Sequence, residues 1–164
     1  MNFRLPVMDP CPFCELVHAD SPWNLIERTP TTVTVLNGRQ FEVGQCFVLP
    51  RRHAPTLLDL TQEECGDVLR AAKRIAHRLN LAYAPEAMLL YQNNGIAVGQ
   101  EVPHFHLHVV PRRAGSDWGP GPHALETANR ANRGAHTDHT VITDGKLAAV
   151  AELLRHSGGG ELQT

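Results

Sequence analysis

Three histidines alternate with apolar residues in the segment His104-Phe105-His106-Leu107-His108-Val109-Val110. Successive side chains of a β-strand point to opposite faces of the sheet. A strand over residues 104–110 therefore places the three imidazoles on one face and the alternate apolar side chains on the other, where a core can bury them. We expect this strand to carry the chemistry of the chain, because three histidines in strict alternation are far less ordinary than a single surface or core histidine.

Other segments predict the elements around this strand. Runs of apolar and β-branched residues predict strands at 24–28, 32–36, 46–49 and 87–92, and Thr29-Pro30-Thr31 predicts a hairpin between the first two. Thr61 and Glu64 form a capping box that begins a helix over 61–80, and a second helix is expected over 146–156. These elements predict an α+β domain with a mainly antiparallel five-stranded sheet, one long helix and a C-terminal helical extension.

Length and charge limit the domain organisation and the partners. The chain has 164 residues, enough for a buried core without disulfides. We expect a catalytic domain over 1–113 with an N-terminal metal motif, and an extension over 114–164 that packs on it and begins with a turn-rich loop. A net charge of −2 provides no field for a nucleic-acid polymer, and no run reaches the ~20 apolar residues of a membrane span. The N-terminus lacks a secretory pattern, so we expect a cytoplasmic protein with reduced cysteines.

The histidine face suits reaction at phosphorus. A neutral imidazole is a good nucleophile near pH 7 and needs no separate base. It can attack phosphorus and hold a phosphoramidate that water then cleaves. A neighbouring imidazole, once protonated, can donate to the leaving group or to a non-bridging oxygen.

Two cysteines near the N-terminus form a second motif, Cys11-Pro12-Phe13-Cys14. This spacing is half of a tetrahedral zinc site, which two imidazoles would complete. Two core cysteines or a redox pair are the alternatives that the spacing leaves open.

The alternating segment resembles the signature of the histidine triad (HIT) family of nucleotide hydrolases and transferases, with all seven positions matched. The flanking residues 99–103, 111–112 and 44–53 are similar too, and the resemblance covers about residues 11–113. It implies an α+β half-barrel fold that usually pairs into a homodimer with a continuous sheet. It also implies a small nucleotide as the substrate.

The resemblance assigns roles to individual positions. It implies that His106 is the nucleophile and that His108 contacts the phosphate and assists the leaving group. It implies a structural zinc held by Cys11, Cys14, His53 and His104. It implies nucleotide contacts by Asn37, Asn93, Gly99, Gln100, Glu101 and Val102, although turn chemistry alone also explains the two asparagines.

Two residues depart from the family pattern. Gln45 stands where many members have a further histidine, and Glu101 stands where many have serine or threonine.

We expect an enzyme that cleaves at the α-phosphate of a nucleoside 5′-phosphate derivative, such as a dinucleoside polyphosphate or a phosphoramidate, through a nucleotidyl-His106 intermediate. The alternatives are a nucleotide-binding regulatory module with little catalysis and a zinc-dependent metallohydrolase.

Overall fold

A single antiparallel sheet organises the chain. The computed structural model describes residues 3–20, 22–38, 40, 42–113 and 144–157, so the expected loop after residue 113 lies outside the described residues. The strands are β1 (Leu25–Arg28), β2 (Thr32–Leu36), β3 (Cys46–Pro50), β4 (Ala87–Tyr91) and β5 (Leu107–Arg112). Their order in the sheet is β1-β2-β3-β5-β4, and each neighbouring pair is antiparallel. The predicted five-stranded sheet and its first hairpin are confirmed.

Both predicted helices are present, and a third was not foreseen. The long helix α2 (Gln62–Tyr83) begins at the expected capping box, in which the Thr61 hydroxyl accepts from the Glu64 N–H and the Glu64 carboxylate accepts from the Thr61 N–H. The C-terminal helix α4 spans Asp144–His156. The additional helix, α1 (Pro12–His18), begins immediately after Cys11. In the part of the chain that the structure describes, no helix combines the length and apolar character needed to cross a bilayer.

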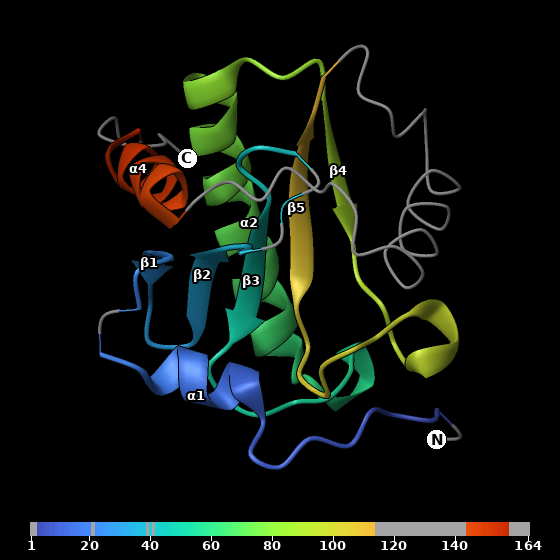
Figure 1. Cartoon of the computed structure of the whole chain (residues 1–164). Helices are drawn as coiled ribbons and strands as arrows, with labels where there is room; N and C mark the ends of the chain where they lie inside the picture. The colour runs from blue at the N-terminus through green and yellow to red at the C-terminus, as the bar shows by residue number, and fades with distance from the viewer. Residues whose placement is uncertain (1–2, 21, 39, 41, 114–143, 158–164) are drawn as a thin grey trace, which may run out of the picture.

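The sheet has helices on both faces (Figure 1). On one face α2 and α4 bury the main core, which includes Val48, Phe105, Val109 and Leu154. The apolar residues of α4 are therefore continuous with the core of the sheet. On the other face α1 covers a smaller cluster whose fully buried members are Val17, Val33, Val35 and Leu49. This second face is where His106, just before β5, and His108 of β5 lie.

The histidine strand begins later than the sequence predicts. We expected it at His104, whereas β5 begins at Leu107. The His104 N–H donates to Val102 O at 2.8 Å, and the Phe105 N–H donates to Ala54 O at 2.6 Å. The N–H groups of His104 and Phe105 thus bond to loop residues rather than to a neighbouring strand, yet the side chains keep the expected alternation.

The strand also continues through Pro111, which we expected to end it. Proline removes a backbone donor and is tolerated where no ladder bond is needed. Strand β3 pairs with β5 from Leu107 to Val109, so of the strands that the structure describes only β4 pairs at Pro111, opposite Met88. The missing N–H therefore interrupts no bond to β3.

Gly44 provides a test of how tightly the turn before β3 packs on α2. Its φ is +97°, and a Cβ there would lie 2.9 Å from both Leu79 Cδ2 and Tyr83 Cε2. We expect Gly44→Ala to destabilise the fold by about 1–3 kcal/mol, through backbone strain and overpacking. Urea denaturation measures this free energy. Gly66→Ala is the control: the three side-chain atoms nearest its Cβ would all belong to the flexible end of Arg70, and we expect it to stabilise α2 by ~0.5–1 kcal/mol. Equal effects of the two substitutions would contradict this account.

Candidate active site and metal centre

His106, immediately before β5, and His108 of β5 lie on the face covered by α1. His106 is 7% exposed and His108 is 8% exposed, and their ring centroids are 5.0 Å apart. Phe13 of α1 and Phe47 of β3 contact His106 edge-on, with centroids at 5.0 Å and 5.3 Å. The rings are therefore packed in an apolar environment that limits their orientation.

Among the described residues, one hydrogen bond orients the ring of His106. Its Nδ1–H donates to the backbone oxygen of His104 at 2.8 Å. In a neutral imidazole only one ring nitrogen carries a proton. The proton on Nδ1 therefore leaves a free lone pair on Nε2, which is the arrangement that a nucleophilic imidazole needs.

Burial keeps both rings in the neutral state. It lowers the pKa of His106 below its ordinary value, while the hydrogen bond to His104 O and the charge of Glu101 act in the opposite direction. Burial, together with the neighbouring His106, lowers the pKa of His108 well below its ordinary value. At neutral pH the Nε2 lone pair of His106 is available for attack, because the charged imidazolium form is disfavoured.

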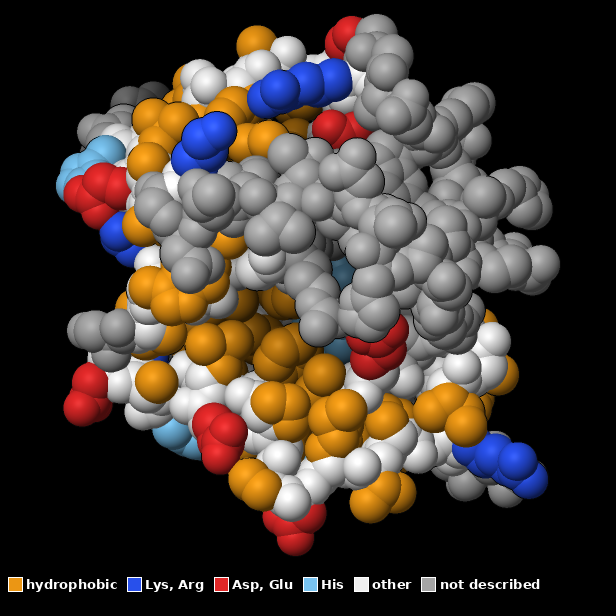
Figure 2. Space-filling view, in the orientation of Figure 1, with side chains coloured by type: hydrophobic (Ala, Val, Ile, Leu, Met, Phe, Trp, Pro, Cys, Tyr) orange, Lys and Arg blue, Asp and Glu red, His pale blue; other side chains and the backbone are white. Residues whose placement is uncertain are grey.

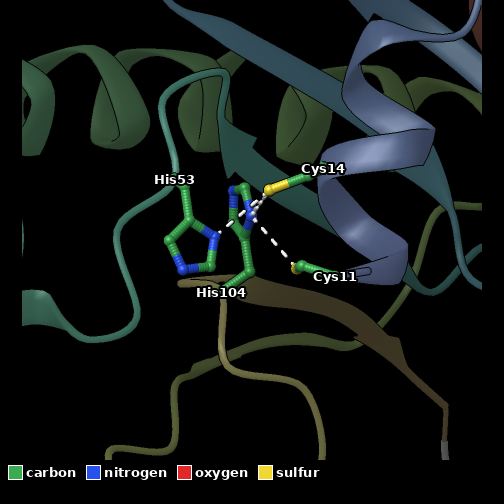
Figure 3. A group of neighbouring side chains, drawn as sticks. All are labelled: Cys11, Cys14, His53 and His104. Atoms are coloured by element: carbon green, nitrogen blue, oxygen red, sulfur yellow. Dashed lines mark hydrogen bonds between the residues drawn. The ribbon is translucent and has the colours of Figure 1, made fainter. Parts of the chain in front are cut away.

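The four predicted metal ligands come together at the start of α1 (Figure 3). The ligand atoms of Cys11, Cys14, His53 and His104 all lie within 4.8 Å of one another. Cys14 Sγ is 3.1 Å from His53 Nδ1 and 3.6 Å from His104 Nδ1. The cysteines come from α1 and the residue before it, His53 follows β3, and His104 precedes β5, so the group joins three segments that are distant in sequence.

The donor set fits a tetrahedral metal. Two sulfurs and two imidazole nitrogens are a typical structural zinc set. The Nε2–H of His104 donates to Pro50 O at 2.9 Å, which leaves Nδ1 free to face the sulfurs. Burial lowers the pKa of His104 to about 4, so the ring is neutral as a ligand must be. Burial and the adjacent Cys11 raise the pKa of the Cys14 thiol to about 11, so metal binding would release its proton.

The loop before the triad is held by one side chain. Gln100 is buried, and its Oε1 accepts from the Gly95 N–H at 2.7 Å. Its Nε2 donates to Pro55 O and Val102 O at 2.7 Å and 3.0 Å. All these partners are backbone groups, so the side chain of Gln100 shapes the loop.

The two asparagines predicted to bind nucleotide each follow a strand of the sheet. Asn37 follows β2, is buried, and donates its N–H to Gln45 O at 2.9 Å. Asn93 follows β4, and its side-chain Nδ2 lies 3.8 Å from the point that a β-carbon would occupy if residue 99 carried one. Gly99 has a φ of +86°. These contacts leave the nucleotide roles of the residues as predictions.

Glu101 is exposed, between the buried Gln100 and the anchored Val102. Burial lowers the pKa of His106, and the Glu101 carboxylate partly opposes this shift. Burial raises the pKa of Tyr91, and the Glu101 carboxylate adds to this shift, so it acts electrostatically on the histidine face. Figure 2 shows histidine atoms set back from the surrounding surface, near an acidic side chain. A negative charge thus stands beside the site where a phosphate would react.

Sequence reasoning missed the residues that pack on His108. Tyr91 stacks on its ring at a centroid distance of 3.9 Å, and Phe47 meets it edge-on at 4.7 Å. Gln45, noted only as a departure from the family pattern, bonds to His108 Nδ1 at 3.2 Å. Strand register could have revealed the two aromatic contacts, since Tyr91 and Phe47 lie directly opposite His108 on the neighbouring strands.

Alternating histidines on one face of an antiparallel sheet are typical of a histidine-triad architecture. Residues 19–115 match the HIT domain model, which covers more than half of the chain. The chain belongs to the HIT family.

Its relatives include named hydrolases. Over 102 residues it is 31% identical to the adenosine 5′-monophosphoramidase of Schizosaccharomyces pombe. The matched segment covers 62% of this chain and 74% of that protein. Over 94 residues it is 31% identical to a bifunctional bis(5′-adenosyl)-triphosphatase/adenylylsulfatase of Arabidopsis thaliana. The matched segment covers 57% of this chain and 52% of that protein.

Solved structures share the fold. A Hit-like protein from Bartonella henselae superposes with a TM-score of 0.72 at 19% identity, over 92% of this chain and 98% of that chain. A zinc-bound histidine triad family protein from Mycobacterium smegmatis superposes with a TM-score of 0.64 at 26% identity, over 88% of this chain and 94% of that chain.

Proposed function

We propose that this protein hydrolyses, or transfers the nucleotidyl group of, nucleoside 5′-phosphate derivatives through a covalent nucleotidyl-His106 intermediate. The observation that carries the proposal is the hydrogen bond from His106 Nδ1–H to His104 O, which leaves a neutral ring with a free Nε2 lone pair. The two relatives named as a phosphoramidase and a triphosphatase support the substrate class.

In the first step the Nε2 lone pair of His106 forms a bond to the α-phosphorus. The bond from phosphorus to the leaving group breaks, and its electron pair goes to the leaving atom. A polyphosphate leaves as an anion, whereas an amine takes one proton from water as it departs. The carbonyl of His104 stabilises the positive charge that develops on the His106 ring, because it accepts the Nδ1–H throughout.

In the second step a water oxygen forms a bond to phosphorus. The P–Nε2 bond breaks, and its electron pair returns to His106. The water proton is released to solvent and the nucleoside 5′-monophosphate departs. Transfer follows when an acceptor other than water attacks. His108 lies beside His106 and is suited to bind a phosphate oxygen.

Nucleotide binding is proposed for the strand ends and the loop before the triad. Asn37 suits ribose hydroxyls, and Asn93 suits the phosphate. Backbone groups of Gly99, Glu101 and Val102 would orient the phosphate, and the side chain of Gln100 holds the loop that contains them.

Cys11, Cys14, His53 and His104 are proposed to hold zinc. Bound there, zinc supplies structural cross-linking of α1 to the residues before β5. A closed set of four protein ligands leaves no position for a reacting water. This observation favours a nucleophilic His106 over the alternative of a zinc-dependent metallohydrolase.

Product analysis tests the proposal and its rivals. We expect purified protein to release AMP from adenosine 5′-phosphoramidate and from diadenosine triphosphate, measured by anion-exchange chromatography. Tight nucleotide binding without AMP release from either substrate would favour a regulatory module. Rapid, reversible loss of activity on chelation with the fold intact would favour a metallohydrolase.

The carboxylate of Glu101 predicts a preference among these substrates. We expect Glu101→Gln to raise kcat/KM for diadenosine triphosphate ~3-fold relative to adenosine 5′-phosphoramidate. The bridging phosphates of diadenosine triphosphate carry additional negative charge, which the Glu101 carboxylate repels. The expected effect is small because solvent partly screens this exposed carboxylate. Glu63→Gln removes the same charge from an exposed position in the first turn of α2 and should leave the ratio unchanged. An unchanged ratio in Glu101→Gln would mean that this carboxylate does not face the substrate.

Assembly and organisation are also proposals. β4 is an end strand of the sheet, and its Leu90 is 43% exposed, which supports homodimerisation through a continuous sheet. The division into 1–113 and 114–164 and a cytoplasmic location stay predictions, as does the absence of a nucleic-acid partner.

A further inference from the structure

Gln45 is a fully buried polar residue immediately before β3. Its backbone is fixed at both ends, since its N–H donates to Glu42 O at 3.0 Å and its carbonyl accepts from the Asn37 N–H at 2.9 Å. Its side-chain Nε2 lies 3.2 Å from His108 Nδ1. With its backbone fixed, Gln45 presents its side-chain amide to the catalytic face, where it also bonds to the side chain of Tyr91.

The chemistry of this contact determines where the proton of His108 lies. The amide nitrogen of glutamine can only donate hydrogen bonds. His108 Nδ1 must therefore accept, which it can do only without a proton. A neutral imidazole has one ring proton, so the proton is on Nε2.

The two strands that flank β5 fix the plane of this ring. Tyr91 of β4 stacks on it with an interplanar angle of 13°, and Phe47 of β3 meets it at 90°. A ring flip would replace the Gln45 contact with a carbon atom. The stacking and the hydrogen bond therefore fix the tautomer and the orientation together.

We propose that Gln45 is a positioning residue that holds His108 as its neutral Nε2–H tautomer, so that His108 stabilises the reacting phosphate as a hydrogen-bond donor and transfers no proton. The inference rests on the proposed function and specifies the part that His108 plays in it. A second ring proton would have to sit on Nδ1, facing the amide N–H of Gln45. His108 therefore assists the leaving group through charge stabilisation rather than as a general acid.

Nitrogen NMR of the ¹⁵N-labelled, substrate-free protein at neutral pH tests the tautomer directly. Comparison with His108→Gln assigns the His108 signals. We expect a protonated Nε2 and a bare Nδ1. A protonated Nδ1 in the parent protein would overturn the inference, and this result does not depend on whether any substrate is turned over.

Substitution of Gln45 tests its part in the effect. In Gln45→Glu a carboxylate oxygen replaces the amide donor, so we expect the ring proton to move to Nδ1 or both nitrogens to be protonated. Gln62→Glu, at the exposed start of α2, is the matched control and should leave the His108 signals unchanged. An unchanged tautomer in Gln45→Glu would also overturn the inference.

Kinetics provide an independent readout. We expect Gln45→Leu, with the fold checked by the dispersion of its NMR spectrum, to lower kcat for adenosine 5′-phosphoramidate ~10–100-fold. KM should change little, because a merely misplaced donor weakens the transition state more than the ground state. A change in KM with kcat unaltered, or no change in either constant, would count against the positioning role.

Discussion

Replacing His106 by alanine is expected to lower kcat for adenosine 5′-phosphoramidate by about a thousandfold or more, because the variant has no atom that can bond to phosphorus. The remaining groups of the site can still bind the nucleotide, so KM should change far less than kcat. Steady-state release of AMP measures both quantities. The side chain is 7% exposed and packs on Phe13 and Phe47, so the variant must first be shown to fold.

A matched variant separates loss of the nucleophile from loss of a histidine. His156→Ala removes an exposed imidazole on α4 whose Nδ1–H donates to Glu152 O within the same helix. It should retain the activity of the parent protein. Undiminished turnover in a folded His106→Ala variant would contradict the proposed mechanism outright.

Loss of the metal site is expected to have the largest effect on stability. If free zinc is present at a thousandfold its Kd, binding to the folded state alone contributes about 4 kcal/mol. Cys14→Ser or a strong chelator should remove most of this free energy and lower Tm. Metal analysis with thermal unfolding measures both changes. Activity should fall with the fold, because His104 supplies both a metal ligand and the carbonyl that orients His106.

Cys65→Ser is the control for this experiment. Cys65 is a partly buried free thiol of α2 outside the four-residue group, so its substitution should leave metal content and chelator sensitivity unchanged. Protein that contains no zinc after purification and reconstitution, with Cys14→Ser as stable as the parent, would exclude the proposed metal site.

The elements that the sequence predicted well are those with local signals. The capping box at Thr61 and Glu64 needs only four consecutive residues, and the structure has both of its reciprocal bonds. Strand β2 matches its predicted range, 32–36, because β-branched residues and flanking turns define it. The five-stranded sheet follows from such segments once their antiparallel pairing is assumed.

The features that the sequence did not predict depend on tertiary contacts. α1 has only seven residues and is stabilised by the packing of Val17 beneath the sheet, so no local pattern marks it. The late start of β5 depends on a bond from Phe105 to Ala54 in another loop. The metal group joins residues up to 93 positions apart, and only the family resemblance pointed to His53 and His104.

The role of Gln45 shows the same limit. The sequence identified it as a departure from the family pattern but gave no reason for the change. The reason requires the position of its amide relative to His108 and the stacked ring of Tyr91. Such a relationship between side chains from β4, β5 and the residue before β3 is available only from the fold.

Direct detection of the covalent intermediate tests the account most sharply. A single-turnover reaction with adenosine 5′-phosphoramidate is quenched in alkali within milliseconds, digested and analysed by mass spectrometry, with His106→Ala as the blank. We predict an adenylyl group on the peptide that contains His106, which appears before AMP and disappears as AMP accumulates. AMP that accumulates while no nucleotide is ever attached to this peptide would contradict attack by His106.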